Sequence, residues 1–148
     1  MQKNKNSGMI FLAFLLSSGF YFSSCGVEPF VSPIPQTSVL EQINLNDLRY
    51  RNLRFVGGYA YFPDAGFKGL VMYRESNNVY RVFDRACPYD PLAECAIVEV
   101  DSSTLFMIDR CCNSQFNFSG MPIGGPATAP MREYRTRIEG NFLIVTSE

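Results

Sequence analysis

The chain has 148 residues, with 13 lysines and arginines, 14 aspartates and glutamates, a formal net charge of −1 and no histidine. This balance gives no sign of the basic face that nucleic-acid-binding proteins carry, so we expect no nucleic-acid partner. The lack of histidine removes the side chain that most often acts as a proton-transfer group or a metal ligand near neutral pH.

The N-terminal segment has the pattern of a secretory signal peptide. Lys3 and Lys5 give it a positive start, and the apolar run over 9–22 is too short to span a membrane comfortably. The run ends in the sequence FSSCG at 22–26, which resembles a bacterial lipobox. We therefore expect residues 1–24 to be a lipoprotein signal peptide and Cys25 to be lipidated, which would anchor the chain in the bacterial cell envelope, on the periplasmic face or the outer membrane. The alternative is an uncleaved N-terminal anchor in which Cys25 has no role.

A short segment rich in proline follows this cysteine. Residues 25–38 contain Pro29, Pro33 and Pro35 and show no periodic apolar pattern, which predicts an extended, lipid-anchored tether. The remaining residues, 39–148, are enough for one compact domain with its own core.

Short β-type runs separated by turn residues make up this domain. The predicted strands cover 39–45, 59–62, 69–73, 79–83, 96–100, 105–108, 133–138 and 141–145. The sequence ESNN at 75–78 is typical of a hairpin loop between two of them. Helix is expected only as a single turn near 46–50 or 91–94. Such short, closely spaced strands predict an all-β fold, either an antiparallel sandwich or a small barrel.

The predicted domain contains four cysteines, Cys87, Cys95, Cys111 and Cys112. A secreted protein reaches an oxidising compartment in which paired cysteines persist as disulfides. Four cysteines allow three pairings, and a bond between two adjacent cysteines strains the peptide between them. Two pairings that link separate loops therefore remain open.

Three segments of the domain carry a family resemblance. They are Cys87-Pro88-Tyr89, the sequence DRCCNSQF at 109–116 and the sequence GGPATAP at 124–130. In this order they resemble a Rieske iron–sulfur domain of the respiratory type, over about residues 80–148. That family has a β-sandwich capped at one end by two loops, which supply two cysteine and two histidine ligands to a [2Fe–2S] cluster. A disulfide joins the two loops, and a Gly-Pro-Ala loop closes over the cluster.

The resemblance also assigns positions to the site residues. The four cluster-ligand positions are occupied, in chain order, by Cys87, Tyr89, Asp109 and Cys112. Only the first keeps the ligand type of the family, and the ordinary cluster needs two imidazoles that this chain does not have. We therefore expect a degenerate site that has lost its cluster.

The same resemblance implies a disulfide between Cys95 and Cys111. We predict a second one between Cys87 and Cys112, because two ligand positions of one small cluster lie within disulfide range. In the alternative, a metal is kept, and the two thiolates, the carboxylate and the phenol of the four ligand positions bind an atypical [2Fe–2S] cluster or zinc.

Our functional hypothesis is a membrane-tethered binding or structural module that is not an enzyme and holds no metal. We expect an envelope protein to contact the former cluster-binding end, formed by loops 85–95, 109–115 and 121–130. The third loop contains Gly124, Gly125 and Pro126. The alternative hypothesis is a redox protein, either an electron carrier with an atypical [2Fe–2S] site or a thiol–disulfide module that uses Cys111 and Cys112.

Overall fold

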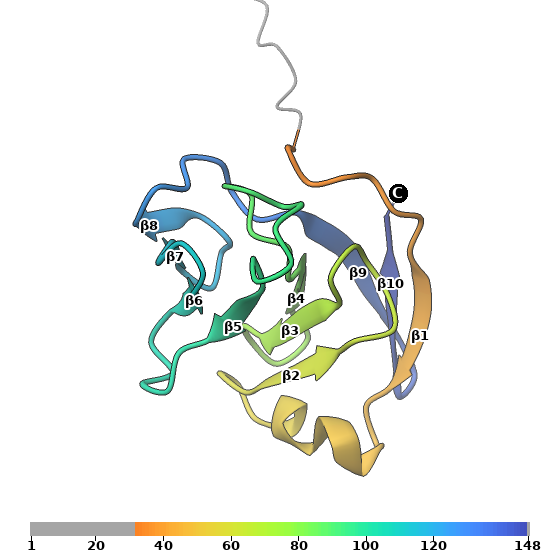
Figure 1. The fold of residues 1–148 in the computed structure, drawn as a ribbon. Helices are drawn as coiled ribbons and strands as arrows, with labels where there is room; N and C mark the ends of the chain where they lie inside the picture. Colours follow the sequence, from red (N-terminus) through yellow and green to blue (C-terminus); the bar gives the residue numbers. More distant parts are fainter. Residues whose placement is uncertain (1–31, 148) are drawn as a thin grey trace, which may run out of the picture.

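The computed structural model describes residues 32–147, so the predicted signal peptide and Cys25 lie outside the described residues. The described part is an all-β fold of antiparallel strands arranged in two sheets (Figure 1). In chain order the elements are β1 (Leu40–Asn44), the 3-10 helix η1 (Leu48–Arg54), β2 (Tyr59–Phe62), β3 (Leu70–Arg74), β4 (Tyr80–Asp84), β5 (Val98–Val100), β6 (Met107–Asp109), β7 (Gln115–Phe116), β8 (Pro122–Gly124), β9 (Glu133–Glu139) and β10 (Phe142–Thr146). The larger sheet has the strand order β1-β10-β9-β4-β3-β2, and the smaller one has the order β5-β6-β7-β8.

The predicted strands agree with this structure to within two residues at each end. The loop at 75–78 joins β3 to β4 as a hairpin, in which Tyr73 pairs with Arg81. Of the two helical candidates, the first is confirmed in a shifted form, because η1 begins after Asp47, whose carboxylate accepts a hydrogen bond from the Arg49 N–H at 2.9 Å. The second is wrong, since residues 91–94 form turns and bends only.

Two hydrophobic cores share the strands β3 and β4. Side chains of a strand point alternately to the two faces of its sheet, so Leu70 and Met72 enter one core while Val71 enters the other. On β4, Val82 faces the first core and Phe83 faces the second. The second core lies against the smaller sheet, so both faces of β3 and β4 are covered and the two sheets are held together through these strands.

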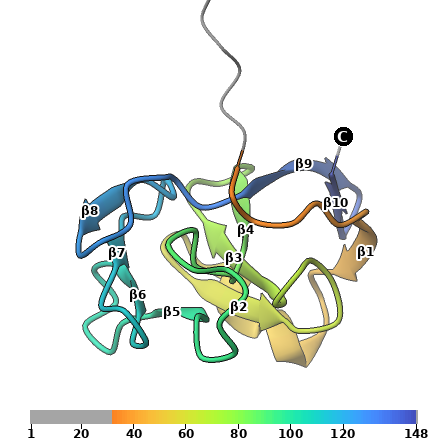
Figure 2. The ribbon, with the colours of Figure 1, turned by 45° about the horizontal axis from the view of Figure 1, so that its top comes forward.

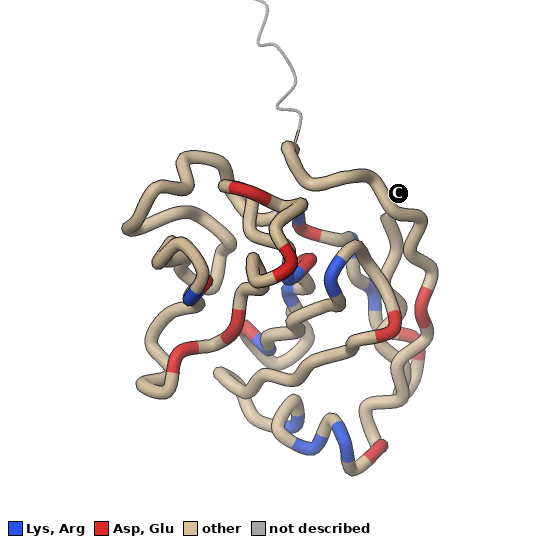
Figure 3. The backbone as a smooth tube through the Cα atoms, viewed as in Figure 1, with Lys and Arg blue, Asp and Glu red and all other residues tan. Residues whose placement is uncertain are grey.

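The first described residues lie on the same side of the molecule as loops 85–95 and 121–130, and η1 lies on the opposite side (Figures 1 and 2). Part of the proline-rich segment packs on the domain, since the Ile34 side chain is buried and Thr37 Oγ1 lies 3.1 Å from Tyr134 Oη. Figure 3 shows that η1 is strongly basic, with Arg49, Arg51 and Arg54 on its seven residues. No helix within residues 32–147 is long and apolar enough to cross a membrane.

Candidate functional site

Loops 85–95, 109–115 and 121–130, which we call the tip loops, meet at one end of the fold. The predicted disulfide between Cys95 and Cys111 is confirmed and joins the first two loops, with a Cα–Cα distance of 5.5 Å. The third loop is attached to the second, because the Ala127 N–H donates to Ser114 Oγ at 3.0 Å. Gly125 brings the same loops into direct contact. It has a φ of +79°, and a Cβ at this position would lie 2.4 Å from the carbonyl oxygen of Asn113.

A buried carboxylate holds the start of the first tip loop. Asp84, at the end of β4, is fully buried and accepts hydrogen bonds from the backbone N–H groups of Phe67, Lys68 and Ala86 and from the hydroxyl of Tyr134 at 2.9 Å. Burial, reinforced by the nearby Asp84 carboxylate, raises the pKa of Tyr134 to about 12. Four donors therefore satisfy a charge that would be very costly to bury alone.

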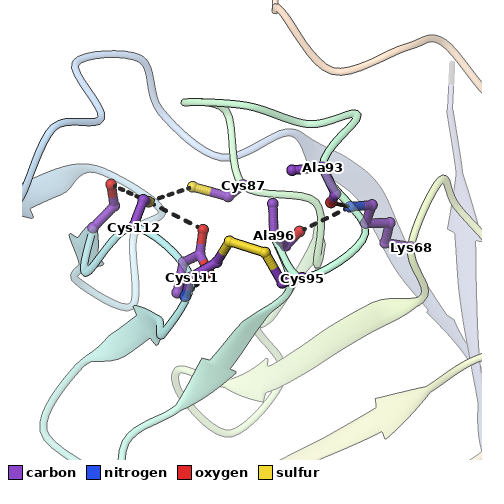
Figure 4. The surroundings of a disulfide bond; sticks show 9 residues. Lys68, Cys87, Ala93, Cys95, Ala96, Cys111 and Cys112 are labelled. Atoms are coloured by element: carbon purple, nitrogen blue, oxygen red, sulfur yellow. Dashed lines mark hydrogen bonds between the residues drawn. A yellow bond between two sulfur atoms is a disulfide. The ribbon is translucent and has the colours of Figure 1, made fainter.

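Lys68 fixes the far end of the same loop. Its ammonium group donates to the backbone carbonyl oxygens of Ala93 and Ala96, as Figure 4 shows. Cys95 lies between these two acceptors, so the ammonium group and the disulfide together define the path of the loop before β5.

Three of the four predicted ligand positions come together where the first two tip loops meet. The Sγ atoms of Cys87 and Cys112 point toward one another at 3.7 Å (Figure 4). Cys112 also donates from its Sγ to Asp109 Oδ2 at 3.1 Å, and its Sγ lies 3.0 Å from Ser114 Oγ. Cys87, Asp109 and Ser114 are buried, while Cys112 is half-buried.

The fourth position, Tyr89, does not join this group. Its side chain is 57% exposed, and the donor atoms that lie within 4.8 Å of one another come from Cys87, Asp109 and Cys112 alone. The phenol therefore points to solvent, where it belongs to the surface of the first tip loop.

The predicted second disulfide is not formed in the structure, in which Cys87 and Cys112 are both free. A disulfide requires an S–S distance of about 2.0 Å, whereas the Cys112 sulfur is held 3.7 Å from its neighbour by hydrogen bonds to Asp109 and Ser114. Burial, together with the neighbouring Asp109 carboxylate, raises the pKa of Cys87 to about 12. Without a bound cation this cysteine is therefore a neutral thiol near pH 7, which is a weak nucleophile.

The cysteine pair and the carboxylate form a compact group that could hold a metal ion. Asp109 also accepts the backbone N–H of Cys111 at 2.8 Å, so one carboxylate oxygen fixes the loop while the other faces the thiols. Among the ion pairs of residues 32–147, none involves Asp109.

Sequence reasoning gave no role to Ser114, Asp84 or Lys68. Ser114 lies within the segment 109–116 that carries the family resemblance, but its bonds to Cys112 and Ala127 depend on the three-dimensional structure. The sequence offers no comparable signal for Lys68, because its acceptors are backbone carbonyls 25 and 28 residues away.

Comparison with known proteins supports the fold. No model of a protein family matches the chain, and no curated protein matches its sequence. The chain is similar in structure to the cyanobacterial plasma membrane Rieske protein PetC3 from Synechocystis PCC 6803, with a TM-score of 0.52 and 16% sequence identity over 75% of this chain and 99% of that one. The chain therefore has a Rieske-like fold, as its motifs predicted.

Proposed function

We propose that the protein is a membrane-tethered module of the bacterial cell envelope that binds a protein partner through its tip loops. The observation that carries this proposal is a set of exposed apolar side chains on the first and third of these loops, namely Tyr89, Leu92, Met121 and Ile123. Tyrosine and methionine are enriched in protein interfaces, and loops presented by a rigid scaffold commonly carry binding functions. The disulfide and the buried bonds of Asp84 supply that rigidity.

The donor set does not fit the [2Fe–2S] cluster that the fold implies. Such a cluster needs two ligands on each of two irons, yet Tyr89 is exposed and lies apart from the other three donors, and a phenol is a poor cluster ligand. The resemblance places Cys87 at a cysteine-ligand position and Cys112 at a histidine-ligand position, which belong to different irons of the cluster, although the two sulfurs are only 3.7 Å apart. We therefore include the loss of the cluster in the proposal.

A binding role, rather than a catalytic one, agrees with the state of the buried thiol. The raised pKa of Cys87 is the opposite of the lowered pKa that activates catalytic cysteines. The alternative of a thiol–disulfide module based on Cys111 and Cys112 has no support from the geometry, because Cys111 is bonded to Cys95.

The membrane tether rests on the lipobox-like sequence that ends at Cys25. We expect radiolabelled palmitate to enter the wild-type protein in a bacterial host and to be absent from Cys25→Ala. Label that persists in the variant, or that never enters the wild type, would contradict the lipid anchor without affecting the proposal for the tip loops.

Photo-crosslinking from matched positions tests the tip-loop proposal. Leu92 on the first tip loop and Leu48 on η1 are 73% and 76% exposed, so they present similar side chains at opposite ends of the fold. A photoreactive amino acid at each position, in cells of the native host, should give a discrete protein adduct from position 92 and none from position 48. Leu92→Asp combined with Met121→Asp should abolish an adduct formed from position 123.

Two results would contradict the tip-loop proposal. One is the same adduct pattern from positions 92 and 48, which would indicate non-specific contact. The other is an adduct from position 92 that contains only lipid, which would assign the exposed apolar side chains to the membrane surface.

A further inference from the structure

We propose that Cys87, Cys112 and Asp109 bind one zinc ion through two thiolates and one carboxylate oxygen. This inference is independent of the tip-loop proposal, because it concerns donor atoms at the junction of the first two tip loops and not the exposed apolar side chains. It also differs from the site that the fold implies, since one ion takes the place of two irons and their bridging sulfides.

The distances between the donor atoms match one tetrahedral ion. With zinc–sulfur bonds of about 2.3 Å, two sulfurs on a tetrahedron lie about 3.8 Å apart. The Sγ atoms of Cys87 and Cys112 are separated by 3.7 Å. With a zinc–oxygen bond of about 2.0 Å, the corresponding sulfur–oxygen separation is about 3.5 Å, and Cys112 Sγ lies 3.1 Å from Asp109 Oδ2. An ion between these two atoms would lengthen this last distance by about 0.4 Å.

The chemistry of the donors selects the metal. Thiolates favour zinc, copper(I) and iron–sulfur clusters, whereas carboxylates favour harder ions. Zinc is the ion in this set that commonly accepts both thiolate and carboxylate ligands in one tetrahedral site. Three protein ligands leave a fourth position for water, as in zinc sites that are not fully closed.

The surroundings of the group support a cation. Asp109 is fully buried and has no cationic partner among the ion pairs of the described residues. Arg110, its neighbour in sequence, pairs instead with Glu99 and Asp101. A buried carboxylate without a counter-charge is costly, and a dication between it and the two sulfurs would supply that charge.

The donor atoms are also held in place before any ion binds. Ser114 Oγ contacts the Cys112 sulfur and accepts the N–H of Ala127, so it orients the ligand from the outside as supporting residues of metal sites do. The disulfide fixes Cys111, which directly precedes Cys112. The two loops are therefore already ordered in the metal-free protein, so metal binding does not have to order them.

Cobalt(II) spectroscopy on the full-length, detergent-solubilised protein, prepared without thiol reductant and stripped with a chelator, tests the site directly. We expect one equivalent of cobalt to give thiolate-to-metal charge-transfer and tetrahedral d–d absorption, and one equivalent of zinc to remove both. Competition with a chromophoric chelator should show zinc binding at least about tenfold weaker for Asp109→Asn and for Cys112→Ser. Asp90→Asn, which changes an exposed carboxylate of the first tip loop, should bind like the wild type.

Several results would overturn the zinc site. These are a wild-type cobalt spectrum without thiolate charge transfer, zinc affinity unchanged in both ligand variants, or non-reducing peptide mapping that shows a Cys87–Cys112 disulfide. The wild-type spectrum decides the matter even if a ligand variant fails to fold. Stoichiometric iron and sulfide would refute both this inference and the proposed loss of the cluster, whereas failure to bind zinc leaves the crosslinking test of the tip loops unaffected.

Discussion

Removing the disulfide between Cys95 and Cys111 should lower the free energy of unfolding by about 3 kcal/mol. The two cysteines are 16 residues apart in sequence, and closing a loop of that size in the unfolded chain removes about 10 cal/mol/K of entropy. Both half-cystines are exposed, so replacing them with serine removes little buried apolar surface. The loop-closure entropy is therefore the whole of the expected effect.

Urea unfolding of the wild type and of the double variant Cys95→Ser/Cys111→Ser, followed by circular dichroism, measures this loss by linear extrapolation. A mild reductant provides the control, because it should destabilise the wild type to the level of the double variant and leave the variant unchanged.

A loss below about 1 kcal/mol would refute this reasoning. It would mean that residual structure already holds Cys95 and Cys111 near one another in the unfolded ensemble, or that the cross-link does not form. A loss well above 3 kcal/mol would contradict the assumption that the disulfide acts only through the unfolded chain.

Three further predictions concern the support of the tip loops. Asp84→Asn should lower the free energy of unfolding by about 3 kcal/mol in chemical denaturation, because an amide cannot accept all the bonds of the carboxylate, while exposed Asp90→Asn should change it by less than about 0.5 kcal/mol. The pKa of Tyr134 rises from 10.0 in the unfolded chain to about 12 in the fold, so the folded state holds this proton more tightly and the free energy of unfolding falls as pH rises from 10 to 12. Between pH 8 and 11 the wild type should therefore lose about 1.4 kcal/mol more than Tyr134→Phe in parallel denaturation curves. Equal losses would contradict the pKa shift. Gly125→Ala should lower the free energy of unfolding by at least about 2 kcal/mol in thermal unfolding. Gly57 also has a positive φ, but nothing lies within 4 Å of the added Cβ, so Gly57→Ala should lower it by only about 1 kcal/mol. Similar losses at the two positions would show that backbone strain alone matters.

The sequence was sufficient to predict the β architecture because most of its strands are long enough to carry their own pattern. The strands β7 and β8 have two and three residues, too few for alternation to be visible, and they join the smaller sheet only because β7 pairs with β6 and β8 pairs with β7. The 3-10 helix η1 was predicted only in part, because its buried residues are limited to Tyr50 and Leu53 and give no full helical face.

Part of the candidate site could also be predicted from sequence motifs, whereas the rest depends on contacts between distant residues. The resemblance carried by 87–89, 109–116 and 124–130 predicted that Cys95 pairs with Cys111 and that Cys87, Asp109 and Cys112 come together. The exposure of Tyr89 and the separation of the two free sulfurs depend on side-chain directions and on hydrogen bonds, which no sequence spacing contains.

The side on which the chain enters the domain determines how an anchored protein would face its surroundings. The first described residues lie on the same side as the first and third tip loops (Figures 1 and 2), and seven residues of fully extended chain, from Cys25 to Ser32, reach at most about 25 Å. A lipidated protein would therefore keep its apolar loops turned toward the bilayer and the basic end of η1 turned away from it. A partner of the loops would then need to be embedded in that membrane or lie close to its surface.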